Sequence, residues 1–360
     1  MKIIVPLDKG GLEGAEEPAT HLNLPLTPSL CKEGEVISQR STNAMIIMTV
    51  KGPILPADAG FVLSHEHLLC DLWSIVRSYD GILHDETLAS AELARFREAG
   101  GQTLVEVSSI GLGRNPEGLL RISNEAGVHV VMGSAWYREE GYPQYIYQLS
   151  VNELAQKIVD DVTKGVDETG IRAGVIGEIG TERYHITPAQ ERVFRASARA
   201  QRQTGVSIWT HTTHFGELAL EQIALLREEG VSSERIVISH LGDRFGAHHF
   251  RKIAEQGVFL GIDNIGYQGD GYPADEVRAR NIAELIQEGF EDQILLSLDI
   301  CMKQHLHSYG GKGYDHLQRK FLPLLAGLGV DQERITKMTV TNPARALAFE
   351  RREQNPKERS

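Results

Sequence analysis

The sequence predicts an α/β fold, and within that class a (β/α)8 TIM barrel. Eight short apolar runs of β-type residues recur along the chain, and amphipathic helical stretches separate them, which is typical of βα units around a parallel sheet. These units occupy about 300 residues, a size that suits such a barrel. The alternative is an open doubly wound sheet, but no GxGxxG motif follows the first run, so the nucleotide-binding signature of many such folds is missing.

The apolar runs give the expected order of the strands. They end near SHEH (64–67), LVEVSS (104–109), VHVVMGSA (128–135), AGVIGEIG (173–180), VSIWTHT (206–212), RIVISHLG (235–242), VFLGIDNIG (258–266) and QILLSLDIC (293–301). Several of the helical stretches between them have an N-cap candidate and a closing glycine. Examples are ETLASAELARFREAGG, SVNELAQKIVDDVTKGV, TPAQERVFRASARAQRQTG and GELALEQIALLREEG, and we expect a final helix at NPARALAFE.

The chain before the first run has a different character. Residues 1–44 contain several prolines and glycines with little periodicity, which predicts an irregular N-terminal arm. The barrel domain is expected to span residues 45–350, and residues 351–360 to form a C-terminal tail.

Composition limits the partners and the compartment. With 360 residues, 41% hydrophobic and 24% charged, the chain has an ordinary globular composition. Its net charge of -12 argues against nucleic acid and anionic membranes as partners, so we expect a small-molecule substrate. A homodimer is the alternative to a monomer. Three distant cysteines and the lack of a long apolar stretch favour the cytoplasm.

Two histidines, His65 and His67, stand two residues apart at the end of the first run. Side chains at positions i and i+2 of a strand point to the same side, so both imidazoles can face one point. Imidazole is a common ligand of zinc and other borderline divalent metals. Such a pair also occurs by chance on solvated strands, so a metal site requires further ligands downstream.

Further ligands do follow, at the carboxyl ends of other strands, where TIM barrels place their chemistry. Five of the eight expected strand ends carry metal-ligand side chains: His65 and His67, Glu178, His211, His240 and Asp299. Each has a structural alternative, such as pairing with an arginine, capping a helix or packing in the core. Six such coincidences at five strand ends are a poor explanation, however, and four imidazoles with two carboxylates can hold two divalent cations. The sequence therefore predicts a binuclear metal centre at the C-terminal face of the strands.

The motifs that carry these residues resemble those of a known family. The segments TVKGPI, SHEH, GEIGT, THTTHFG, SHLGD, LSLDI and VTNPARAL, in this order and spacing, are similar to the phosphotriesterase family of the amidohydrolase superfamily. The resemblance implies a distorted TIM barrel with two divalent metal ions, with zinc expected and manganese or cobalt as alternatives. It also implies that Glu178 bridges the two ions, that His211 and His240 bind the more exposed one, and that the more buried one is bound by His65, His67 and Asp299.

Two positions depart from the commonest family pattern. Glu178 stands where many members carry a carboxylated lysine, which resembles the lactonase-like branch that includes the phosphotriesterase homology proteins. Asn264, after Asp263, stands where phosphotriesterases have a histidine and many lactonases an arginine. The first departure needs no modified side chain, and the second weakens the case for either specific activity.

The resemblance and the ligand set predict a metal-dependent hydrolase that cleaves a lactone or carboxylic ester with a metal-bridging hydroxide. Two adjacent metals lower the pKa of a shared water, and Asp299 is the best-placed group to move its proton to the leaving group. The alternatives are an amide (N-acyl) hydrolase, a phosphotriesterase, or a catalytically silent barrel that binds metal or ligand.

Substrate contacts are expected from the loops after the strands. Tyr137, after the third run, resembles a loop tyrosine of lactonase-like relatives, and Asn264 follows the seventh. Lys303 and His305, together with Lys312, lie in the loop after the eighth run and could bind an anionic group. The structural alternative for each is a rim or lid residue.

Overall fold

The computed structural model describes residues 44–213, 217–269 and 271–350. The N-terminal arm and the C-terminal tail expected from the sequence therefore fall outside the described residues, except for Ala44. Within these ranges no helix is both long enough and apolar enough to cross a membrane.

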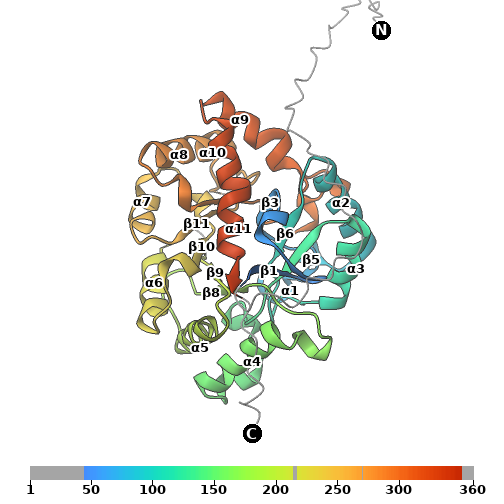
Figure 1. Cartoon of the computed structure of the whole chain (residues 1–360), viewed down its shortest axis with the longest axis vertical. Coiled ribbons are helices and arrows are strands. Elements are labelled where there is room, and N and C mark those ends of the chain that lie inside the picture. The colour runs from blue at the N-terminus through green and yellow to red at the C-terminus, as the bar shows by residue number, and fades with distance from the viewer. Residues whose placement is uncertain (1–43, 214–216, 270, 351–360) are drawn as a thin grey trace, which may run out of the picture. The chain divides into compact units, whose positions relative to one another are not determined.

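The described residues form a TIM barrel with eight parallel strands, as the sequence predicts (Figure 1). Every strand lies at one of the expected apolar runs. The strands are β3 (Val62–Glu66), β6 (Thr103–Glu106), β7 (His129–Met132), β8 (Ile176–Gly180), β9 (Ile208–His211), β10 (Ile236–Ser239), β11 (Phe259–Ile262) and β12 (Ile294–Leu296).

Hydrogen bonds join the two parts of the sheet into a closed barrel. The strands pair as β3-β6-β7 and as β8-β9-β10-β11-β12. At one seam the Gly177 N–H donates to the Ser134 carbonyl, with an N···O distance of 2.9 Å, and at the other the Asp299 N–H donates to the His65 carbonyl over 3.2 Å. The second seam brings the predicted ligands of β3 and of the segment after β12 side by side.

Helices follow the strands and surround them. In Figure 1, α2 to α8 succeed one another around the barrel in the order of the colour bar. The helices are α1 (Trp73–Val76), α2 (Glu86–Glu98), α3 (Pro116–Ala126), α4 (Val151–Thr163), α5 (Pro188–Thr204), α6 (Ala219–Glu228), α7 (His248–Ala254), α8 (Asp275–Gln287), α9 (Leu322–Gly327), α10 (Gln332–Thr336) and α11 (Asn342–Leu347). The remaining short strands are β1 (Met45–Thr49), β2 (Gly52–Ile54), β4 (Cys70–Asp71), β5 (Ile82–Leu83) and β13 (Phe349–Glu350).

Local sequence explains where the main helices begin and end. Ser150 and Thr187 cap α4 and α5, each accepting the backbone N–H three residues on, while Glu153 and Gln190 reach back to the capping residues. Each capping residue of this kind contributes about 1 kcal/mol. The final helix is shorter than expected at NPARALAFE: α11 ends at Leu347, because the next residues pair with β1 as β13.

Two apolar clusters form the core. The larger one packs the outer faces of the strands against the helices. The smaller one takes residues from or beside each of the eight barrel strands, together with Ala346 and Leu347 of α11. Alternation along each strand explains this division, since neighbouring side chains face opposite sides of the sheet. The barrel interior is therefore filled at one end, and polar side chains gather at the other.

Candidate metal centre

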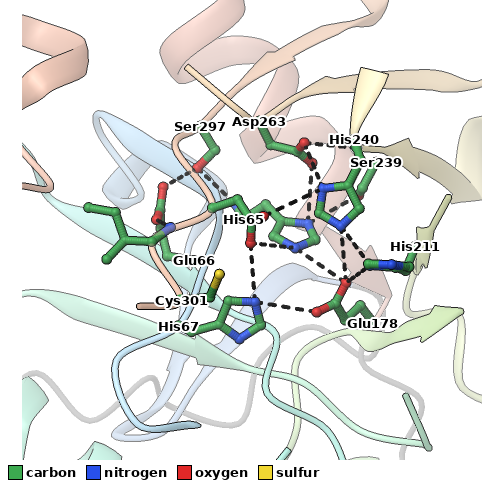
Figure 2. A network of polar contacts seen from close by, with 12 residues as sticks. His65, Glu66, His67, Glu178, His211, Ser239, His240, Asp263, Ser297 and Cys301 are labelled. Atoms are coloured by element: carbon green, nitrogen blue, oxygen red, sulfur yellow. Dashed lines mark hydrogen bonds and ion pairs between the residues drawn. The ribbon is translucent and has the colours of Figure 1, made fainter. Parts of the chain in front are cut away.

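The first strand brings its two histidines to one point at the mouth of the barrel. His65 and His67 are both buried, and their ring centroids lie 5.8 Å apart. Their Nε2 atoms face the same carboxylate, that of Glu178 from β8, at 3.5 and 3.3 Å (Figure 2). The i, i+2 spacing thus has the outcome expected from the sequence.

Glu178 lies between the two halves of the cluster. Its Oε1 faces His67, and its Oε2 lies 2.9 Å from His211 Nδ1 and 3.4 Å from His240 Nε2. The residue before it must be small, because a Cβ on Gly177 would lie 2.2 Å from the Trp209 carbonyl oxygen and the φ of Gly177 is +135°. The glycine lets β8 approach β9 closely, which brings Glu178 to His211.

The remaining two ligand candidates approach from β10 and from the segment after β12. His240 Nε2 lies 2.7 Å from His211 Nδ1, and register explains this, since His211 pairs with the residue directly before His240. Asp299 Oδ1 lies 3.4 Å from His67 Nε2 and 3.8 Å from His65 Nε2. The structure therefore brings all six predicted ligands together.

Further polar groups contact three of the imidazoles at Nδ1, the ring nitrogen that faces away from the centre of the cluster. His67 Nδ1 lies 2.9 Å from Ser108 Oγ, His65 Nδ1 lies 3.1 Å from Ser239 Oγ, and His240 Nδ1 lies 3.1 Å from Asp263 Oδ1. A hydrogen bond at Nδ1 fixes the ring orientation and leaves Nε2 as the nitrogen available to a metal. All three Nε2 atoms face the centre of the cluster.

The two carboxylates are held in the ionised form that a metal ligand requires. Burial would raise the pKa of Glu178, but the electrostatic interaction with His65 and the hydrogen bonds from the His211 and His240 imidazoles hold that pKa well below its ordinary value. Burial likewise would raise the pKa of Asp299, and the histidines around it hold that pKa low. For His211, burial and the charge of His240 lower the pKa to about 3, so its ring is neutral at pH 7.

The donor set fits divalent cations. Three overlapping groups each place their ligand atoms within 4.8 Å of one another: His65, His67 and Glu178; His65, His240 and Asp299; and Glu178, His211 and His240. His65 Nε2 is buried and finds no hydrogen-bond partner among the described residues, although it faces two carboxylates. A cation between these groups would satisfy that nitrogen, and imidazoles with carboxylates are the ligands that zinc-like metals prefer.

Two of the predicted substrate residues lie at this cluster. The buried Tyr137 places its hydroxyl 3.2 Å from His211 Nε2, and burial together with the Glu178 charge raises its pKa well above the ordinary value, so it remains a hydroxyl. Asn264 Nδ2 lies 3.4 Å from Asp299 Oδ2. Both side chains therefore adjoin predicted metal ligands.

The basic residues of the loop after β12 have protein partners. Lys303 Nζ donates to the Tyr79 carbonyl over 2.9 Å, and Lys312 Nζ donates to the Gly266 carbonyl over 2.6 Å. His305 Nδ1 lies 3.2 Å from the Tyr267 hydroxyl, which donates to the Asp299 carbonyl. Among these three residues, the links given by the structure connect only His305 to the ligand cluster, through Tyr267.

Sequence reasoning missed two carboxylates near the centre. Asp263 accepts both the backbone N–H and the ring of His240, and Glu66 binds the segment that carries Asp299. Both were visible in the motifs GIDNIG and SHEH, where an acidic residue is adjacent to a candidate functional residue. Neither could be assigned a partner without the fold.

A TIM barrel whose mouth gathers four imidazoles and two carboxylates belongs to the class of metal-dependent barrel enzymes. Comparison with known proteins makes the class more specific. The chain belongs to the phosphotriesterase family, whose sequence model matches residues 45–347. It is a metal-dependent hydrolase of that family.

The matches to known proteins extend over nearly the full length of each relative. The chain is 35% identical to the phosphotriesterase homology protein of Escherichia coli, over 79% of this chain and 97% of the relative. It is 31% identical to the N-acetyltaurine hydrolase of Danio rerio, over 84% of this chain and 98% of the relative. Among solved structures, a lactonase from Listeria monocytogenes is similar with a TM-score of 0.80 and 30% identity, covering 85% of this chain and all of the lactonase.

Proposed function

We propose that this hydrolase cleaves a lactone or a carboxylic ester at the six-residue cluster, using two divalent cations, with zinc expected first and manganese or cobalt as alternatives. The single observation that carries the proposal is the placement of Glu178. One of its oxygens faces His67, and the other faces His65, His211 and His240, so one carboxylate adjoins both halves of the cluster.

In the proposed assignment the two halves hold one cation each. His65, His67 and Asp299 hold the first, and their ligand atoms lie within 3.8 Å of Asp299 Oδ1. The second is held by His211 and His240, whose facing nitrogens are 2.7 Å apart. Glu178 contributes to both. When bound, the two cations supply Lewis acidity and lower the pKa of a shared water.

Asp299 is the proposed acid and base. Its carboxylate is ionised and buried, its Oδ1 adjoins the first-strand histidines, and its Oδ2 faces the Asn264 amide. An ionised carboxylate in this position can accept a proton from the attacking water and return it to the leaving group. The Asn264 side chain orients the carboxylate, since its amide N–H donates to Oδ2 while Oδ1 stays directed at His65 and His67.

Tyr137, Asn264, Lys303 and His305 are the proposed substrate-binding residues. Tyr137 is a neutral hydroxyl beside His211, so it can donate to a carbonyl oxygen as charge develops there. Burial lowers the pKa of His305, so it acts as a neutral polar group. Lys303 Nζ donates to the Tyr79 carbonyl, so it can contact only a substrate that reaches the loop after β12.

Two comparisons support carbonyl substrates. The lactonase from Listeria monocytogenes has a similar fold, which favours the lactone, and the N-acetyltaurine hydrolases favour an N-acyl amide as the second candidate. Ester and amide cleavage require the same groups here, namely a nucleophilic water, an acid to protonate the leaving group and a donor for the carbonyl oxygen.

A substrate panel tests the proposal. The protein, purified as it exists and loaded with zinc, manganese or cobalt, is assayed with lactones, aryl esters, N-acyl amines including N-acetyltaurine, and a paraoxon-like phosphotriester. We expect hydrolysis of a lactone or ester that disappears on chelation and returns with metal. Faster turnover of N-acyl amines would select the second candidate. Turnover of the triester alone, or binding of a panel compound without turnover, would contradict both.

A further inference from the structure

Glu66 stands between His65 and His67 in sequence but takes no part in the ligand cluster. Figure 2 shows its side chain directed away from the imidazoles, toward Ser297. The residue is fully buried, and its carboxylate accepts three hydrogen bonds. Oε1 accepts from Ser297 Oγ at 2.6 Å and from the Leu298 N–H at 2.7 Å, and Oε2 accepts from the Ile300 N–H at 2.8 Å.

These donors come from the residues on both sides of Asp299. Regular pairing of β12 ends at Leu296, so the Leu298 and Ile300 N–H groups lie beyond the strand, and the carboxylate takes the place of a neighbouring strand. Asp299 itself has a φ of +55°, in the left-handed region that non-glycine residues rarely adopt. Such a conformation persists only where the surroundings fix it, and here both flanking amides are fixed by the same carboxylate.

The segment after β12 is also joined to the first strand by direct hydrogen bonds. The His65 N–H donates to Ser297 Oγ over 2.9 Å, and the His67 N–H donates to the Ile300 carbonyl over 3.2 Å. The two histidines and Asp299 are therefore parts of one hydrogen-bonded unit, and the Glu66 carboxylate lies at its centre.

We propose that Glu66 is a positioning residue, which holds the Asp299 backbone in its left-handed conformation and so fixes the Asp299 carboxylate against His65 and His67. The proposal rests on the proposed role of Asp299. Its physical basis is that both Glu66 oxygens accept backbone N–H groups. In a Glu66→Gln variant the amide must turn its NH2 toward one of those N–H groups, whichever way it is oriented.

The chain contains a matched control. Glu92 in α2 is also buried, and it accepts the same three kinds of hydrogen bond from the same loop: the Ser308 hydroxyl at 2.7 Å, the Ser308 N–H at 2.9 Å and the His307 N–H at 3.0 Å. Glu92→Gln therefore introduces the same conflict between two donors, but at residues with no hydrogen bond to the ligand cluster. A difference between the two variants reports the position of Asp299 rather than general damage.

The experiment compares Glu66→Gln with Glu92→Gln in the full-length protein. We expect the two variants to show similar decreases in the urea midpoint. Only Glu66→Gln should bind zinc about tenfold less tightly, measured by competition with a chelator, and only this variant should lower kcat about tenfold or more while KM stays within about twofold. We also expect faster hydrogen exchange at Leu298 and Ile300 in Glu66→Gln alone. Equal zinc retention and equal kcat in the two variants would overturn the proposal.

Two further readouts keep the test decisive. If Glu66→Gln does not fold, Glu66→Asp keeps two acceptor oxygens on a shorter side chain. We expect this variant to bind zinc more weakly than the wild type and Glu92→Gln do, but more tightly than a double variant that combines Glu66→Asp with Ser297→Ala. A crystal structure of either Glu66 variant with Asp299 unmoved would overturn the proposal. Because zinc retention and hydrogen exchange need no substrate, they separate this inference from the proposed function, which fails if the metal-loaded wild type hydrolyses nothing in the panel.

Discussion

The carboxylates at the barrel mouth and those on the helical surface have the same chemistry but different surroundings. At the mouth, Glu178 and Asp263 are buried, and their partners are imidazoles and backbone N–H groups. Between α5 and α6, Glu229 and the more exposed Glu228 pair instead with the flexible guanidinium groups of Arg195 and Arg199. The first set is fixed in a low-dielectric environment, whereas the second is close to water and screening salt.

This difference separates chemical function from stability. A carboxylate buried at the barrel mouth attracts a cation strongly, because water does not weaken the interaction. An exposed carboxylate beside arginine gains little, since both groups are well hydrated when apart. Changes at the mouth should therefore affect metal and turnover most, and changes on the helices should affect only unfolding, by a small amount.

The largest effect is expected for Glu178→Ala, which removes the carboxylate that adjoins both halves of the cluster. We expect loss of bound metal together with a decrease in kcat well beyond about a hundredfold, the upper range for changes outside the ligand set. His240→Ala should behave alike, whereas Asp299→Asn should keep part of its metal but lose most turnover. Metal analysis of each purified variant beside its kcat measures this, and a wild-type rate in any of them would contradict the assigned roles.

A smaller effect is expected for Asp263→Asn, because this carboxylate is outside the ligand set and contacts two of the ligand histidines at Nδ1. It accepts the His240 N–H at 2.8 Å and His240 Nδ1 at 3.1 Å, and its second oxygen lies 3.4 Å from His65 Nδ1. The amide keeps one acceptor and replaces the other with a donor. We expect metal affinity to fall about 10- to 100-fold, as measured by chelator competition, with the urea midpoint little changed. Unaltered affinity would show that the His240 orientation does not depend on Asp263.

The strands and the six ligand candidates were predictable because their signals are local. Each apolar run marks its own strand, and a TIM barrel places the carboxyl ends of all its strands on one face. His211 and Asp299 could therefore be predicted to lie close together from the sequence alone. The direction of long side chains and the partners of buried carboxylates were not predictable. Lys303 bonds to a carbonyl from another loop, and Glu66 binds residues more than two hundred positions away. Such contacts depend on the packing of segments remote in sequence.

At the start of α8, Asp275 is expected to affect stability in a pH-dependent way. It accepts from the Gly266 N–H and from Arg278 and His316, at 2.8, 2.9 and 2.8 Å. Burial would raise its pKa, but these hydrogen bonds and the Arg278 charge hold the pKa below the ordinary value of 3.8. The stability that a lowered pKa provides is fully present when the pH is above the pKa of the group in the unfolded state. It is lost as the pH falls through the pKa of the group in the folded state.

Asp275→Asn should therefore lower the free energy of unfolding by about 2 kcal/mol at pH 7, since the buried Arg278 loses its charged partner. The difference from the wild type should shrink as the pH falls below about 4. Urea unfolding from pH 7 down to pH 3 measures it. A difference that stays constant across this range would show that the ionised carboxylate is not the source of the stability.

The smallest effect is expected on the helical surface, for Glu229→Gln. Its carboxylate accepts from Arg199 Nε at 2.9 Å and from Arg195 at 3.2 Å, and so links α5 to the end of α6. Even this network should contribute less than about 1 kcal/mol, and that contribution should fall further at 1 M salt. Glu228→Gln is the matched control, since this more exposed side chain has one arginine partner. A loss at Glu229 as large as that at Asp275, or one unaffected by salt, would remove the distinction between fixed and solvated carboxylates.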